Sequence, residues 1–194
     1  MINVIVFMGE AGSGKDRVLN EILASDSSLH RVISYTTRPK RENEVEGRDY
    51  YYVSEDHFFE LTKIGSMYEH SLHHWWYGTG VNSYDENKIN VAVLNPEGIR
   101  NLIDDGRFNI TVYWVRAAAK TRLLRQLNRE EDPDCNEIVR RYGTDTDDFS
   151  LINFDYIDLP NDNIEELREA LWMVQQDIRE LKTAPPHNSL DISD

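Results

Sequence analysis

The feature that most constrains this chain is a glycine-rich segment at residues 9–16, which stands between two strongly patterned stretches. It reads Gly9-Glu10-Ala11-Gly12-Ser13-Gly14-Lys15-Asp16. The apolar run at 2–8 predicts a buried strand, and apolar residues at helical spacing predict a helix over 15–25. A strand, a glycine turn and a helix start in this order form a cradle for phosphate, because backbone N–H groups, the helix dipole and a lysine all face the anion. We therefore predict a phosphate site at 9–16.

The last residue of this segment departs from the usual phosphate loop, which ends in Ser or Thr so that a hydroxyl can bind Mg²⁺. Here Asp16 takes that place. A glycine turn that joins a strand to a helix without binding anything is the alternative interpretation. The complete Gly-Ser-Gly-Lys run and the strand and helix around it favour the phosphate loop.

Composition and charge exclude several classes of protein. The chain has 194 residues, 40% of them hydrophobic and 29% charged, which is typical of one soluble domain with a real core. Its net charge of −14 disfavours binding to nucleic acid or to an anionic membrane, so an anionic substrate needs a local cluster of cations. A single cysteine, Cys135, cannot form an internal disulfide, which favours the cytoplasm. We expect a monomer or a homodimer.

Strand-like and helix-like stretches alternate along the chain. After the first helix, strands are predicted at 31–34, 89–95, 109–115 and 155–159. Helical patterns cover 117–142, with a break at 132–134, and the stretch from 161 to about 181. This alternation predicts an α/β fold with five parallel core strands and helices on both faces of the sheet.

A second cluster of cations lies beside hydroxyl residues at 34–41. The segment reads Ser34-Tyr35-Thr36-Thr37-Arg38-Pro39-Lys40-Arg41. Arginine forks bind phosphate oxygens through two parallel hydrogen bonds, so this run predicts a second phosphate site. A solvated basic turn is the common alternative, but it is less convincing in so acidic a chain.

The segment from Ser34 to Val53 resembles the acceptor-binding segment of guanylate kinases, in which Ser-x-Thr-Thr-Arg leads through Gly-x-Asp-Tyr to a strand. The resemblance extends from the glycine-rich loop to about Lys182. It implies a P-loop kinase fold in a single domain, with parts that project from a core. These are the core 1–33, 82–125 and 143–182, a GMP-binding insert 34–81, a lid 126–142 and a tail 183–194.

The resemblance also implies how GMP is bound. Arg38, Arg41, the Tyr50 hydroxyl and Tyr77 align with residues that hold the GMP phosphate.

Three more residues align with the site for the base. Ser34 and Thr79 would face the guanine ring, and Glu69 would determine the specificity for guanine over adenine. Its carboxylate accepts both N1–H and the exocyclic amine, a donor pair that adenine lacks. The histidines around it, His70, His73 and His74, could suggest a metal site, but their spacing matches no closed zinc pattern. We favour a loop packed on the insert.

The metal ligands depart from the family in two places. The strand at 89–95 ends in Asn95-Pro96-Glu97-Gly98, where guanylate kinases have Asp-x-Gln-Gly. The family has a hydroxyl on the loop and a carboxylate on the strand, whereas this chain has Asp16 and Asn95. We hypothesise that the anionic Mg²⁺ ligand has moved to the loop, which a hard octahedral ion accepts. Loss of the usual activity is the alternative.

The arginine-rich stretch 117–142 resembles the lid of nucleoside monophosphate kinases. Arg129, and either Arg140 or Arg141, align with lid arginines that neutralise the phosphoryl group in transfer. For Arg122 and Arg125 we favour a solvated helix face with paired charges. Asn161 aligns with an asparagine near the adenine of ATP.

The family therefore implies transfer of phosphate from ATP to GMP or dGMP with Mg²⁺, with Lys15 and the loop amides on the β- and γ-phosphates. Two alternatives stay open. Ribose bisphosphate phosphokinases resemble this family, carry Gly-Ser-Gly-Lys-Asp and have an Asn near the end of the corresponding strand, so the acceptor could be a sugar bisphosphate or another nucleotide. The second alternative is a binding module like the guanylate-kinase-like domains of scaffold proteins, but those have lost the phosphate loop.

Overall fold

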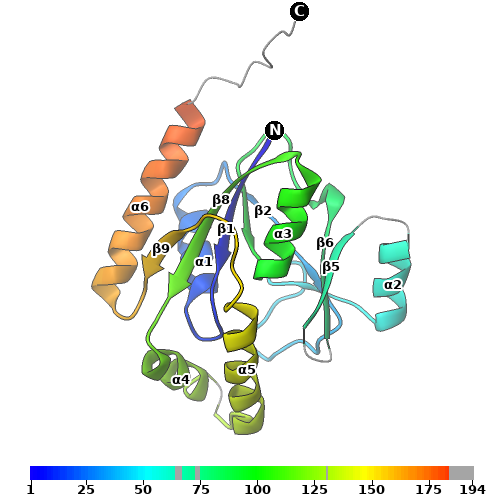
Figure 1. The fold of residues 1–194 in the computed structure, drawn as a ribbon, viewed down its shortest axis with the longest axis vertical. Helices are drawn as coiled ribbons and strands as arrows, with labels where there is room; N and C mark the ends of the chain where they lie inside the picture. The colour runs from blue at the N-terminus through cyan, green and yellow to red at the C-terminus, as the bar shows by residue number, and fades with distance from the viewer. Residues whose placement is uncertain (64–66, 73–74, 130, 184–194) are drawn as a thin grey trace, which may run out of the picture.

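The structure is a computed structural model that describes residues 1–63, 67–72, 75–129 and 131–183, with 63 and 67–72 described by their backbone alone. Its centre is a five-stranded sheet in the order β2-β7-β1-β8-β9 (Figure 1). These strands are β2 (His30–Arg31), β7 (Asn90–Val93), β1 (Ile2–Met8), β8 (Phe108–Arg116) and β9 (Ile157–Pro160). All the neighbouring pairs are parallel, which confirms the predicted sheet.

Helices cover both faces of this sheet because β1 is apolar on both sides. Ile5 and Phe7 pack with α1 (Lys15–Ser25) and α6 (Ile164–Thr183). Val4, Val6 and Met8 pack on the other face, which α3 (Pro96–Asp105) covers, so Figure 1 has α1 and α3 on opposite sides of β1. Successive strand residues point to opposite faces, so one buried strand serves two hydrophobic cores.

A second, smaller sheet stands beside the core, with helix α2 (Glu55–Lys63) at its outer side (Figure 1). Its order is β4 (Tyr51–Tyr52), β3 (Tyr35–Thr36), β6 (Trp75–Gly80) and β5 (Met67–Leu72). The buried Phe58 of α2 and its neighbour Phe59 pack on the ring of Trp76. A short 3₁₀ turn, η1 (Val81–Ser83), returns the chain to the core.

The helices α4 (Ala119–Leu127) and α5 (Cys135–Asp148) lie at the end of the molecule opposite the C-terminal end of α6 (Figure 1). The predicted helical stretch 117–142 is thus two helices, and the second continues to Asp148. Helix α5 begins at Cys135 because the Asp134 carboxylate accepts the N–H groups of Asn136 and Glu137 as an N-cap. The division into core, insert and lid stays a prediction.

Two other boundaries differ from the sequence-based expectation. The strand predicted at 31–34 is shorter, because the chain leaves the core sheet and joins the second one, where the Ser34 carbonyl accepts the N–H of Tyr51. Helix α6 begins at Ile164 rather than at 161, because Asn163 and Glu166 form a reciprocal cap at its start. Within the described residues, no helix is long and apolar enough to cross a membrane.

Candidate active site

The glycine-rich loop between β1 and α1 lies tightly against other parts of the backbone. Gly9, Gly12 and Gly14 all have positive φ angles. A Cβ on Gly12 would lie 2.5 Å from the Arg122 carbonyl oxygen, and one on Gly14 would lie 2.4 Å from Nδ2 of Asn161. Only glycine fits at these two positions, so the sequence fixes the loop in contact with α4 and with the end of β9.

The carbonyl groups of the loop are held from behind. Ser13 O accepts from Asn161 Nδ2 at 2.7 Å and from Arg125 Nη1 at 3.0 Å, and Arg125 also reaches Gly12 O at 3.3 Å. A carbonyl and the N–H that follows it point in opposite directions across a planar peptide. The Gly14 N–H therefore faces away from Asn161 and Arg125, which orients it for an anion.

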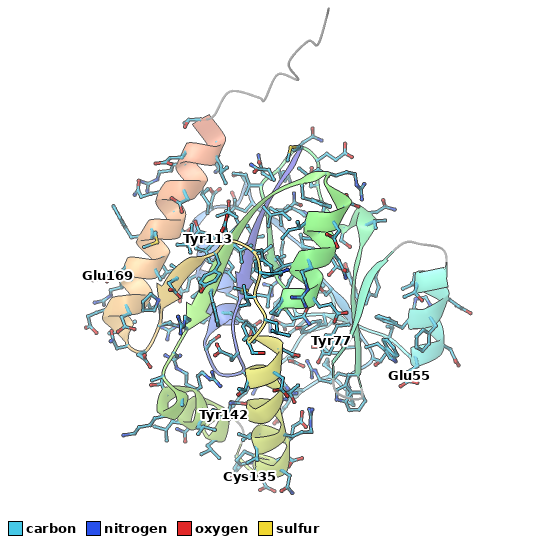
Figure 2. The ribbon with its side chains drawn as sticks, in the orientation of Figure 1. Glu55, Tyr77, Tyr113, Cys135, Tyr142 and Glu169 are labelled. Carbon is cyan, nitrogen blue, oxygen red and sulfur yellow. The ribbon has the colours of Figure 1, made fainter. Side chains whose placement is uncertain are left out.

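The solvated helix face predicted for Arg122 and Arg125 is wrong. Arg122 is only 7% exposed, and its Nη1 donates to Glu10 Oε1 at 2.7 Å. The guanidinium lies 5.0 Å from the centre of the ring of Tyr142, which sits between α4 and α5 (Figure 2). Helix α4 runs directly behind the loop, so its charged side chains meet loop groups instead of water.

Two residues predicted to bind ATP form hydrogen bonds that hold the loop. The Glu10 carboxylate accepts from Arg122 and, at 3.3 Å, from Trp114 Nε1. Asn161 is 3% exposed and bonded to the back of the loop. Neither lines the central cavity, and neither does Ser13, whose side chain is fully buried.

A cavity of about 480 Å³ opens in front of the loop and is bordered by residues from three regions of the chain. The loop and the start of α1 contribute Gly9, Ala11, Gly12, Gly14, Lys15 and Asp16. The region of the second sheet contributes Ser34, Arg38, Arg41, Tyr50 and Tyr77, and the region of α4 and α5 contributes Arg125, Arg129, Arg140 and Arg141. The structure thus brings most of the predicted site residues to one cavity, including both Arg140 and Arg141.

The arginines of the predicted acceptor site are held by a residue that sequence reasoning missed, Glu44. Its Oε1 accepts from Arg38 Nη2 at 2.8 Å, and its Oε2 accepts from the Arg41 backbone N–H and from the Tyr52 hydroxyl. Burial would raise the pKa of Glu44, but the hydrogen bonds from Arg38 and the Arg41 backbone lower it to about 2. An acidic residue three positions after Arg41 was the signal available in the sequence.

Two tyrosines, Tyr50 and Tyr77, lie beside the Arg38–Glu44 ion pair. The rings of Tyr50 and Tyr77 meet edge to face with centroids 5.9 Å apart, and the Arg38 guanidinium lies 5.6 Å from the Tyr50 centroid. Burial raises the pKa of Tyr50, and the nearby Asp16 carboxylate adds to the shift. The Tyr50 hydroxyl therefore keeps its proton, so it can donate to an anion.

The arginines of α5 are arranged by a single carboxylate. Glu137 accepts from Arg140 Nε and Nη2, both at 2.7 Å, and from Arg141 Nε at 2.6 Å. The hydrogen bonds from Arg140 lower the pKa of Glu137 to about 2, and Arg141 adds to the effect against partial burial. The bond to Glu137 uses only Nε of Arg141, so among the residues whose side chains are described its two Nη groups can still donate to a ligand.

Positive charge converges from the two sides of the cavity. Burial lowers the pKa of Arg41 to about 10. The next causes are the positive charges of three arginines, Arg141, Arg38 and Arg129. Two of these come from the predicted lid and one from the acceptor segment, so a bound phosphate would relieve repulsion between them.

The residues predicted to bind the guanine base are described only in part by the structure. Ser34 Oγ and Thr79 Oγ1 are 2.8 Å apart, and Thr79 is 3% exposed. In the ladder between β5 and β6, Glu69 pairs with Gly78, but its side chain lies outside the description, as does that of His70. His73 and His74 lie outside the described residues. The described part of the chain contains no cluster of three His, Cys, Asp or Glu side chains fit for a metal.

The two predicted metal ligands differ in their surroundings. Asp16 stands in the first turn of α1 and borders the cavity. Asn95 also borders the cavity, but its Oδ1 accepts the Gly98 N–H at 2.8 Å and caps α3. Carboxylate oxygen is the harder ligand, so the chemistry of Asp16 fits Mg²⁺ better than that of the Asn95 amide.

Comparison with known proteins gives a consistent result. The family model for guanylate kinase matches residues 1–180. A guanylate kinase of Wolbachia pipientis is 26% identical over 190 residues, with 94% of each chain covered, and one of Thermotoga maritima is 29% identical over 174 residues, with 87% of this chain and 83% of the relative covered. A guanylate kinase structure from Anaplasma phagocytophilum shares the fold with a TM-score of 0.63 at 18% identity, over 94% of this chain and 88% of that one. The resemblance noted in the sequence is confirmed, and the chain belongs to the guanylate kinase family.

Proposed function

We propose that this protein transfers the γ-phosphoryl group of ATP to GMP or dGMP. One observation carries the proposal. A glycine-rich phosphate loop and a separate group of acceptor-side arginines border the same cavity, and lid arginines lie close enough to Arg41 to shift its pKa. A phosphoryl group can pass between two bound nucleotides only where two anion sites face each other in this way.

The loop would bind the donor. Lys15 and the loop N–H groups hold the β- and γ-phosphates of ATP, supported by the hydrogen bonds that fix the loop carbonyls from behind. The acceptor phosphate is held by Arg38, Arg41, Tyr50 and Tyr77, and the base by Ser34, Thr79 and Glu69. No general base is needed, because the attacking oxygen already belongs to a phosphate anion.

Arg129, Arg140 and Arg141 would neutralise the charge that moves from donor to acceptor. Asp16 would hold Mg²⁺, which shields the phosphate oxygens when it is bound. A test of that ligand is the pair Asp16→Ser and Asp16→Ser with Asn95→Asp. We expect the single variant to lose turnover and the double variant to regain part of it. Aspartate is also a good N-cap, so α3 keeps its start. Absence of rescue would refute the exchanged ligand.

The test of the function is a coupled assay of ADP release with ATP and Mg²⁺. GMP, dGMP, AMP, dTMP and ribose 1,5-bisphosphate are offered side by side as acceptors. We expect turnover with GMP or dGMP and at most about 1% of it with AMP, because Glu69 would be left facing adenine without its donor pair. ADP release with the sugar bisphosphate alone would overturn the proposal, and so would no release with any acceptor.

A further inference from the structure

A carboxylate of α5 is bonded to the phosphate loop. Asp145 Oδ2 accepts the Ala11 N–H at 2.7 Å, across 134 positions of sequence. On the other side of the same residue, Gln126 Nε2 of α4 donates to the Ala11 carbonyl at 3.4 Å. Both polar groups of one loop residue are therefore held by the two helices α4 and α5.

The position of Asp145 along α5 links this contact to the arginine that faces the cavity. Glu137, Arg141 and Asp145 are spaced four residues apart, so their side chains lie along one side of the helix. At one end of this row Glu137 binds Arg141, and at the other end Asp145 binds the loop. A turn of α5 by a single residue, about 100°, would break the loop contact and carry Arg141 away from the cavity.

The charges around Asp145 fit an indirect role. Burial raises the pKa of its carboxyl, while the Ala11 N–H, Lys15 and Arg122 oppose that shift. Asp145 borders the cavity, but a carboxylate repels phosphate, so direct contact with a nucleotide phosphate would be unfavourable. The Ala11 N–H and the positive charges of Lys15 and Arg122 instead stabilise the carboxylate where α5 contacts the loop.

We propose that Asp145 is a positioning residue that docks α5 on the phosphate loop and thereby presents Arg141 to the phosphoryl group in transfer. The inference rests on the proposed function. It predicts that donor loop and lid arginine are ordered together, so damage to the contact lowers the rate of transfer more than it weakens binding of the acceptor.

Steady-state kinetics of three variants test this role, with whichever acceptor gives the highest turnover in the assay above. We expect Asp145→Ala to lower kcat about tenfold, the size typical of a misplaced transition-state group, and to change KM for the acceptor by less than about twofold. Asp145→Asn keeps an oxygen that accepts the Ala11 N–H, so it should retain most of the activity. Asp147→Asn, on the same helix but exposed, is the matched control.

A double-mutant cycle with Arg141→Ala decides whether Asp145 acts through that arginine. We expect Asp145→Ala to lower kcat by less than about twofold in the Arg141→Ala background, because the group that it positions is already gone. An undiminished tenfold loss in that background would overturn the proposal. An equal loss in Asp145→Asn and Asp145→Ala would do the same.

Hydrogen exchange of the folded proteins without nucleotide tests the docking itself. We expect Asp145→Ala to speed exchange in the loop and in α5, and Asp147→Asn to leave both unchanged. Exchange that does not change in Asp145→Ala overturns the proposal whatever the activity. If Asp145→Ala shows the faster exchange but the wild-type protein has no turnover with any acceptor, the docking holds and the proposed function is refuted instead.

Discussion

The cavity has one glutamate on each side that organises two arginines, and the two differ in how they are fixed. Glu44, on the acceptor side, is 11% exposed and is bonded to Arg38, the Arg41 backbone and the Tyr52 hydroxyl. Glu137, on α5, is 32% exposed, and its partners Arg140 and Arg141 stand three and four residues further along the same helix. The Glu44 carboxylate connects Tyr52 of β4 to the loop that holds Arg38 and Arg41, whereas the Glu137 carboxylate bonds to arginines of its own helix.

This difference predicts that the acceptor site is fixed, while the arginines of α5 would move together with their helix. Breaking a buried ion pair leaves a charge without its partner and costs about 3–5 kcal/mol, whereas an intrahelical pair near the surface contributes about 0.3–0.5 kcal/mol. Arg38 and Arg41 should therefore be in position before GMP binds, and that position should depend on Glu44. The arginines on α5 can travel with the helix, since their partner travels too.

The largest effect should follow from Arg38→Ala. The variant removes a phosphate ligand and leaves Glu44 partly buried without its main partner. We expect kcat/KM for GMP to fall at least 10³-fold, and the free energy of unfolding to fall by about 3 kcal/mol. Coupled kinetics and urea unfolding measure the two losses. Arg17→Ala is the control, because Arg17 is 60% exposed and its pair with Glu21 spans 4.0 Å. A stable but inactive Arg38→Ala would contradict the role of Glu44.

A smaller effect on the same side should follow from Glu44→Gln. Glutamine has one side-chain oxygen and one NH₂ group. The NH₂ group would face hydrogen-bond donors that one of the two Glu44 oxygens now accepts. We expect about 2 kcal/mol less stability and a KM for GMP raised about tenfold, with kcat changed by less than about threefold. The result that speaks against a preformed acceptor site is a fall in kcat with KM unchanged.

The sequence predicts the two anion sites more completely than the contacts that hold them. The phosphate loop and the basic run are local patterns, and the apolar strand at 2–8 needs only its own residues to be recognised. The pairs Glu10–Arg122 and Ala11–Asp145 join positions 112 and 134 residues apart, so no local pattern reveals them. The sequence alone therefore predicts a solvated face for Arg122, which the structure buries against Glu10.

The missed carboxylates fall into two groups. Glu137 precedes Arg140 and Arg141 at the spacing of neighbours on a helix, so charge patterning could have found it once the start of α5 was known. Asp145 had no such signal, because its partner is a backbone amide on another element. The strand expected at 31–34 was too long for a related reason, since the second sheet competes for the backbone of Ser34.

Glu137→Gln should affect the rate of transfer and little else. One amide oxygen cannot serve the three hydrogen bonds that Arg140 and Arg141 donate. We expect kcat to fall about threefold to tenfold, both KM values to stay within about twofold, and stability to change by less than about 0.5 kcal/mol. The opposite pattern, a raised KM for GMP with normal kcat, would place Glu137 in acceptor binding and erase the contrast with Glu44.

The finest comparison comes from the acid dependence of stability. The pKa of each glutamate is about 2 in the folded protein, below about 4.3 for an unfolded glutamate. A carboxyl with a lowered folded-state pKa stabilises the protein above about pH 4.3, and this contribution is lost as the pH falls from about 4.3 toward 2. Glu44→Gln should flatten the stability curve in that window, and Glu137→Gln should flatten it by less, because its ion pairs are more exposed to solvent.

Salt should separate the two contributions. Because the Glu137 side chain is 32% exposed, ions screen its pairs, whereas the pair of Glu44 with Arg38 is largely shielded. Urea unfolding at low salt and at about 0.5 M salt should therefore show the Glu137→Gln effect shrinking and the Glu44→Gln effect persisting. Glu131→Gln, exposed just before α5, should leave the curve unchanged. Equal salt sensitivity of the two variants would mean that water reaches both glutamates alike, and that the acceptor side is no more rigid than α5.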